Sequence, residues 1–216
     1  MRIYHFILMA FTLLIGGIDA YAVGLPSVNG TVQQYLLNPH GEPDGLLLSD
    51  GTVIKFPPHL GVALASHVKP GDPVEVIGFL GVQAPQGRAV KALSIRNTTT
   101  GQTLLDQPPT SLKPLKHDEA NEAFTVSGTV THLLVNQHGD TDGLILSGSE
   151  QVKFRPHQAP MVQAMLTDAH AVLTVSGVGI RNAFGTVIRA KSLRVDGKTL
   201  ELDDKRDKPK KGKKHR

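Results

Sequence analysis

The stretch GTVQQYLLNPHGEPDGLLLS at residues 30–49 returns, without a gap, as GTVTHLLVNQHGDTDGLILS at residues 128–147. The match continues to Lys55-Phe56-Pro57-Pro58-His59 and its counterpart Lys153-Phe154-Arg155-Pro156-His157. About half of the aligned positions from 30 to 59 are identical. Self-similarity of this length at a fixed period predicts two copies of one structural unit, so the fold is decided by what one copy forms.

Each copy reads as three strands, a short helix and two further strands. Apolar and β-branched residues predict these elements in the first copy, with strands at 28–37, 46–48, 53–56, 74–79 and 89–95 and the helix at 60–68. Asp50-Gly51 predicts a type I′ hairpin turn between the second and third strands. The second copy repeats this order, with its helix at 161–166.

This order of elements resembles an OB-fold barrel, and Gly30 inside the first strand fits the bend that such a strand needs. The resemblance implies a mostly β protein of two tandem five-stranded OB-fold-like barrels, each with a short helix between strands 3 and 4. An SH3-like barrel, the nearest alternative, lacks a helix at that place. The motifs also resemble those of uncharacterised secreted bacterial proteins with tandem modules of this kind, which implies a fold and a compartment but no activity.

The N-terminus has the features of a signal peptide over residues 1–22: Arg2, an apolar run from Phe6 to Ile15, and the small-x-small pattern Ala20-Tyr21-Ala22. The alternative is an uncleaved anchor, for which the run is short. The mature chain is therefore expected to be periplasmic or secreted, and it is not expected to be transmembrane. The further boundaries place the first module at 23–106, a linker at 107–123, the second module at 124–202 and a basic disordered tail at 203–216.

Charge is concentrated in the tail. The whole chain has a net charge of +4, and eight Lys or Arg against three Asp give residues 203–216 a net charge of +5. The two modules are therefore close to neutral, whereas a domain that binds a phosphate backbone normally has a basic face. Nucleic acid is not the expected partner of the modules, while the basic tail is expected to touch anionic surfaces. The chain has no Cys, which excludes thiol catalysis and thiolate metal sites.

The motif Asn-x-His-Gly-(Glu/Asp)-x-Asp-Gly lies between the first two strands of both copies. A plain turn accounts for its Asn, Gly and Asp-Gly, which favour positive φ and side-chain-to-backbone hydrogen bonds. A turn does not require the imidazoles, so the motif is also a candidate ligand site. Tyr35 is added as the best candidate for an exposed stacking aromatic. The candidate ligand-binding residues are Tyr35, Asn38, His40, Asp44, His59, Asn136, His138, Asp142 and His157.

The repeated histidines suggest a metal site. The first and third strands run the same way, so His40 and His59 are expected at one pole of the barrel. Paired imidazoles beside a carboxylate have the composition of a Zn or Cu site, although the helix start could equally use His59 as a cap. The candidate metal ligands are His40, His59, His138 and His157.

The sequence contains no recognisable catalytic set. There is no Ser-His-Asp arrangement, no glycine loop that would hold a phosphate and no carboxylate pair at catalytic spacing, so the chain is not expected to be an enzyme. Alternation with Ile54 and Val152 predicts that Phe56 and Phe154 are core residues rather than base-stacking platforms. The expected function is an exported, non-enzymatic binding module for an envelope protein or a small ligand. The alternatives are divalent-metal binding through the paired histidines and oligonucleotide binding by the OB fold.

Overall fold

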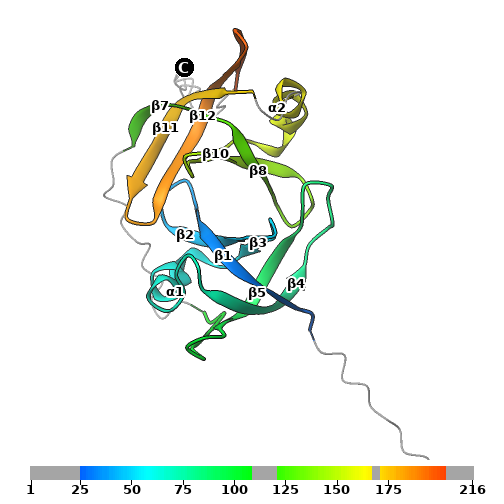
Figure 1. The fold of residues 1–216 in the computed structure, drawn as a ribbon, viewed down its shortest axis with the longest axis vertical. Coiled ribbons are helices and arrows are strands. Elements are labelled where there is room, and N and C mark those ends of the chain that lie inside the picture. The colour runs from blue at the N-terminus through cyan, green and yellow to red at the C-terminus, as the bar shows by residue number, and fades with distance from the viewer. Residues whose placement is uncertain (1–24, 109–120, 167–170, 203–216) are drawn as a thin grey trace, which may run out of the picture.

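The computed structural model describes residues 25–108, 121–166 and 171–202. The expected signal peptide, the expected basic tail and residues 109–120 of the expected linker lie outside the described residues. The described chain is mostly β, with two short helices, and its two repeats lie side by side (Figure 1). No helix within these ranges is long and apolar enough to span a bilayer.

The first repeat forms a closed five-stranded barrel. Its elements are β1 (Ser27–Leu37), β2 (Pro43–Leu48), β3 (Val53–Lys55), η1 (Pro58–Leu60), α1 (Gly61–His67), β4 (Pro73–Leu80), β5 (Ala89–Asn97) and β6 (Thr103–Leu105). The strand order is β3-β2-β1-β4-β5-β6, and a parallel pairing of β3 with β5 closes the barrel. The helix lies between the third and fourth strands, as the sequence predicts.

The second repeat contains the same elements, but its sheet is open. They are β7 (Glu122–Gly128), β8 (Val130–Val135), β9 (Thr141–Leu146), β10 (Gln151–Lys153), η2 (Pro156–Gln158), α2 (Ala159–Met165), β11 (Leu173–Asn182), β12 (Gly185–Val195) and β13 (Lys198–Glu201). The strand order is β7-β11-β12-β10-β9-β8, with β13 on β12. The expectation of two closed barrels is therefore correct for the first repeat only. The counterpart of β1 is divided at Thr129, so β7 pairs only with β11 and β8 only with β9.

Each repeat has its own core, to which the strands contribute alternate residues. In the first repeat Leu46, Leu48 and Ile54 are fully buried, and α1 adds Leu64 to the same cluster. In the second repeat Leu144, Leu146 and Val152 have the corresponding places, and α2 adds Val162. Phe56 and Phe154 are buried in these two clusters, which confirms their prediction as core residues.

The turns follow the sequence only in part. Gly51 has a φ of 84°, but Asp50 is not at positive φ, so the predicted type I′ turn at Asp50-Gly51 is wrong. Both central residues are at positive φ instead in the turn between β12 and β13, where Asp196 has a φ of 49° and Gly197 a φ of 77°. That pair has the backbone that a type I′ hairpin requires.

A third core joins the two repeats. It is a cluster of buried apolar residues from both of them, and we call it the shared core: Leu36, Leu47, Val53, Ala84, Ala89, Leu134, Val135 and Ile145. Figure 1 shows β2 and β3 of the first repeat opposite β8 and β10 of the second. Leu47 lies between Leu46 and Leu48 on β2 and points away from their cluster, so β2 is buried on both faces.

Candidate functional site

The motif loops fold as turns built on their asparagines. Oδ1 of Asn38 accepts hydrogen bonds from the backbone N–H groups of His40 (2.8 Å) and Glu42 (3.1 Å). Asn136 does the same for His138 (2.8 Å) and Asp140 (3.0 Å). The turn chemistry predicted for Asn38 and Asn136 is thus confirmed.

The glycines of the motif have two different uses. Gly41 and Gly139 have φ values of 79° and 83°, so they supply the left-handed backbone of the turn. Gly45 lies inside β2 and is not at positive φ, contrary to the expectation for an Asp-Gly turn. A Cβ at Gly45 would lie only 2.5 Å from the carbonyl oxygen of Ile54, so this position is restricted by the close approach of β3.

Each motif loop contacts a hairpin of the other repeat. The backbone N–H of Val82, in the β4–β5 hairpin, donates to the carbonyl of Gln137 at 2.9 Å. In the reciprocal contact, Nδ2 of Asn182, at the β11–β12 hairpin, donates to the carbonyl of Gly41 at 2.8 Å. The loops that the sequence marks as candidate ligand sites are therefore part of the interface between the repeats.

Tyr35 is buried rather than exposed, which corrects the prediction of a stacking aromatic. Its side chain is 9% exposed, and its hydroxyl donates to the carbonyl of Val68 at 2.6 Å. Phe184, from the β11–β12 hairpin, meets the Tyr35 ring edge to face at a centroid distance of 5.8 Å. Burial and the nearby Asp72 carboxylate raise the pKa of the Tyr35 phenol above its ordinary value. Tyr35 therefore packs against the second repeat and is not available to a ligand.

Four charged residues at equivalent positions of the two repeats lie close together at the interface. Nζ of Lys55 is 3.4 Å from Oδ1 of Asp44, and the corresponding residues of the second repeat are Lys153 and Asp142. Desolvation and the positive charge of Lys55 lower the pKa of Lys153 to about 8, while the carboxylates of Asp142 and Asp44 act in the opposite direction. Among the described residues, Oδ1 of Asp142 is buried and accepts no hydrogen bond.

The candidate histidines are exposed and do not form a metal centre. Nε2 of His59 lies 2.8 Å from the carbonyl oxygen of Gln107. His157 lies in η2, at the helix start, and His40 and His138 lie in the motif loops. Within residues 25–108, 121–166 and 171–202, no group of three or more His, Asp or Glu side chains is placed to hold a metal ion. The geometry therefore adds nothing to the Zn or Cu hypothesis.

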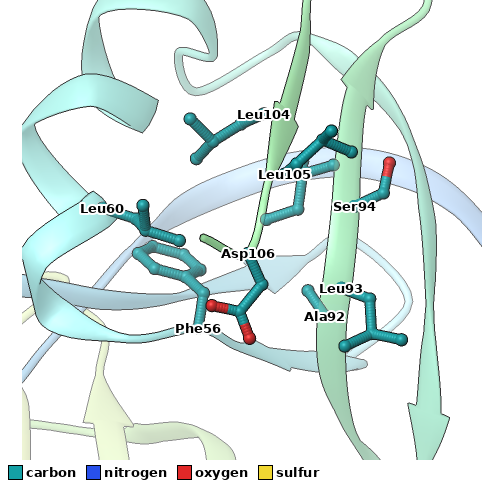
Figure 2. Close-up of a pocket in the computed structure, with 9 residues that line it drawn as sticks. Phe56, Leu60, Ala92, Leu93, Ser94, Leu104, Leu105 and Asp106 are labelled. Atoms are coloured by element: carbon teal, nitrogen blue, oxygen red, sulfur yellow. The ribbon is translucent and has the colours of Figure 1, made fainter. Parts of the chain in front are cut away.

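Cavities in the described chain are small or open. Figure 2 shows an apolar pocket between Phe56 and Leu60 on one side and Leu104 and Leu105 of β6 on the other. Its volume is about 10 Å³, which is at most the room that one water molecule needs. An open depression of about 370 Å³ lies beside the β2–β3 turn, where Asp50 of the first repeat and His132 of the second are among the lining residues. Neither has the enclosed shape of a typical small-molecule site.

A comparison with models of known protein families found no match, and a comparison with curated proteins found none either. The functional argument therefore rests on the sequence and the structure alone.

Sequence reasoning selected Asp44 and Asp142 as candidate ligand-binding residues, not as interface residues, and it missed Lys55, Lys153 and Gln151. The missed signal is the run of three apolar residues at 46–48 and again at 144–146. A strand with only one buried face alternates, whereas an unbroken apolar run indicates burial on both faces. Lys55 and Lys153, which come directly before Phe56 and Phe154 and point away from the cores, then lie on that second buried face.

Proposed function

We propose that this chain is an exported, non-enzymatic binding protein of two OB-fold-like modules, and that its ligand is another protein bound on the outer surface of the first repeat. The observation that carries the proposal is an apolar surface at the end of β4. Phe79, Leu80 and Val82 are 52%, 42% and 58% exposed, and they follow one another within four positions. Phe79 lies on the outer face of the sheet with its β5 partner Lys91, and large apolar side chains exposed in this way are typical of protein-binding surfaces.

Neighbouring residues enlarge this surface. The register of β1 on β4 sets Ser27 opposite Ile77, and Gly78 donates its backbone N–H to the carbonyl of Pro26 at 3.2 Å. The next residue outward, Leu25, is therefore beside Phe79, and it is 46% exposed. The apolar surface thus covers the ends of two adjacent strands.

The second repeat provides an internal comparison for this surface. In the alignment that matches Gly78 to Gly177, the counterparts of Phe79, Leu80 and Val82 are Val178, Gly179 and Arg181. The guanidinium of Arg181 lies over the Phe124 ring at 5.3 Å, so the corresponding surface is partly covered and charged. β11, the counterpart of β4, thus forms without large exposed apolar side chains at these positions. Their presence in the first repeat is therefore attributed to binding rather than to folding.

The oligonucleotide alternative finds little support in this arrangement. OB folds commonly bind their ligands on the face of strands 2 and 3 and on the loops between strands 1 and 2 and between strands 4 and 5. In this chain the corresponding parts of each repeat contribute to the shared core or contact the other repeat. The surface that such a module would offer to a nucleic acid is therefore covered by its sister module.

Site-specific photocrosslinking tests the proposal. A benzophenone side chain replaces Phe79 in the full chain, which is expressed in the organism that makes it and irradiated there. Val62, which is 67% exposed on α1, is the matched control position. We expect one discrete protein adduct from position 79 and none from position 62. No adduct at position 79, or the same adducts at both positions, would contradict the proposal.

A second experiment tests whether the adduct depends on the Phe79 side chain when the crosslinker is at another position. With the benzophenone moved to Leu25, which lies beside Phe79, the change Phe79→Ser is expected to reduce the yield of that adduct at least tenfold, because the largest apolar side chain of the surface is gone. The change Val62→Ser is expected to leave it unaltered. Saturable binding of Zn²⁺ or of a single-stranded oligonucleotide that Phe79→Ser does not affect would instead favour one of the alternative functions.

A further inference from the structure

The two repeats face each other through the outer faces of corresponding strands. On β3, Ile54 points into the first core, while Val53 and Lys55 lie on the opposite face, toward the second repeat. On β10, Val152 points into the second core, and its neighbour Gln151 lies on the interface. β3 and β10 are equivalent strands of the two repeats, and each contributes its outer face to the interface.

At one pair of equivalent positions on these two strands, the repeats have different types of side chain. Gln151 aligns with Val53, and it is a buried polar side chain with only 1% exposure. Its Oε1 accepts a hydrogen bond from the backbone N–H of Leu37 at 2.7 Å. Its Nε2 donates to the carbonyl of Tyr35 at 2.8 Å. A single side chain of the second repeat thus pairs with a donor and an acceptor of β1 in the first repeat.

The local backbone explains why these two groups need a partner. The pairing of β1 with β2 shifts register between Leu36 and Leu37, as in a β-bulge. β1 also pairs with β4 only from Ser27 to Thr31, so beyond Thr31 one edge of β1 has no strand beside it in the sheet, and buried backbone groups that stay unpaired there are costly. Gln151 supplies both hydrogen bonds at this point. A valine there, as in the first repeat, could supply neither.

We propose that the β2–β3 face of the first repeat is a docking surface specific for the second repeat, that Gln151 selects this partner, and that the surface holds the two repeats together without the chain that connects them. A second copy of the first repeat fits the surface poorly, because Val53 would stand where Gln151 now stands. The reciprocal contacts Val82–Gln137 and Asn182–Gly41 add specific hydrogen bonds around the shared core. The test of this pairing does not involve Phe79, so its outcome is separate from that of the ligand proposed there.

The test uses the folded full chain, cut after folding. A protease recognition sequence is placed within residues 109–120, and the cut protein is followed by light scattering and by size-exclusion chromatography over a dilution series. We expect the cut wild-type protein to remain one particle with the mass of the uncut chain. Separation into two halves at micromolar concentration would overturn the proposal.

Two variants test the role of Gln151. Gln151→Val is expected to raise the dissociation constant of the cut protein at least tenfold, a change of about 1.4 kcal/mol. The matched control is Gln158→Val, because Gln158 is also buried but its Oε1 accepts a hydrogen bond from Arg155 within the same repeat. The control is expected to leave the dissociation constant within twofold of wild type. Equal dissociation constants for wild type and Gln151→Val would contradict the selection by Gln151.

A folding defect is distinguished by circular dichroism of each uncut variant. If Gln151→Val does not fold, Gln151→Leu, which keeps more of the side-chain volume, replaces it with the same expected tenfold effect. Cut wild-type protein that separates overturns the docking surface whatever either variant does.

Discussion

Lys153 is an interface residue whose pKa lies far below its ordinary value in water. It lies on β10 near a second lysine, Lys55, and two carboxylates, and its pKa is lowered to about 8. A lysine whose pKa is lower in the folded than in the unfolded state binds its proton less tightly when folded. The charged form therefore opposes folding at neutral pH.

The lowered pKa of Lys153 gives a pH-dependent stability with a defined sign. Between pH 8 and the unfolded value of about 10.4, the unfolded state holds more protons, so the free energy of unfolding should rise with pH. Urea titrations at pH 7 and pH 9.5 measure this, and the upper pH stays below the titration of Tyr35. We expect Lys153→Met to be more stable than wild type by about 1–3 kcal/mol at pH 7, with a smaller difference at pH 9.5.

Lys91→Met is the matched control, because Lys91 is exposed on β5. Its difference from wild type should be small and should not depend on pH. A constant difference between Lys153→Met and wild type across this range would show that Lys153 does not titrate there.

At single residues, sequence reasoning succeeds where the chemistry is local and fails where it depends on the other repeat. Asn38 and Gly41 behave as predicted, because an asparagine turn needs only the residues next to it. Tyr35 was predicted to be exposed, but Phe184, about 150 positions later in the sequence, packs against its ring. Nothing near Tyr35 in the chain signals that contact.

Among the secondary-structure elements, the β11–β12 hairpin has the largest effect beyond its own repeat. Ile180 and Val187 from its strands belong to the core cluster of the first repeat, and Phe184 at its tip packs against that cluster. The hairpin of the second repeat thus completes the core of the first.

Removing the aromatic side chain at the hairpin tip should therefore weaken the first repeat. We expect Phe184→Ala to lower the free energy of unfolding by about 1–3 kcal/mol, less than for a fully buried aromatic residue because Phe184 is only partly buried. The matched control is Gln86→Ala at the equivalent position of the β4–β5 hairpin, which should change stability by less than about 0.5 kcal/mol. Chemical denaturation of the full chain measures both, and equal effects would contradict the packing role of Phe184.

The sequence predicts the order of the elements but not the difference between the two sheets. Gly30-Thr31-Val32 and Gly128-Thr129-Val130 are identical, yet β1 is continuous through the first and the second is divided at Thr129. Two identical tripeptides cannot by themselves predict different backbone hydrogen bonding. The difference must come from what surrounds each segment, which a single-sequence pattern does not describe.

On the scale of the whole molecule, the shared core decides how the repeats unfold. Each repeat has its own full set of strands, which considered alone would suggest two units that fold independently. The burial of Leu47 and Ile145 in one cluster predicts instead that the folded chain behaves as one cooperative unit.

Hydrogen exchange with and without Leu47→Ala tests this cooperativity. Leu47 is fully buried, so its truncation should cost about 2–5 kcal/mol. In a single unit, protection should fall by the same free energy in the slowest amides of both repeats. Loss of protection confined to the first repeat would show that the two halves unfold independently.

Because the two matching faces belong to one polypeptide, their pairing does not depend on how dilute the protein becomes. Separate chains that met through the same faces would come apart once their concentration fell below the dissociation constant. A covalent connection instead keeps each face at a high effective concentration of its counterpart, which is about a millimolar when the linker is short. If the chain is exported, as we propose, that difference determines whether the pair survives dilution outside the cytoplasm.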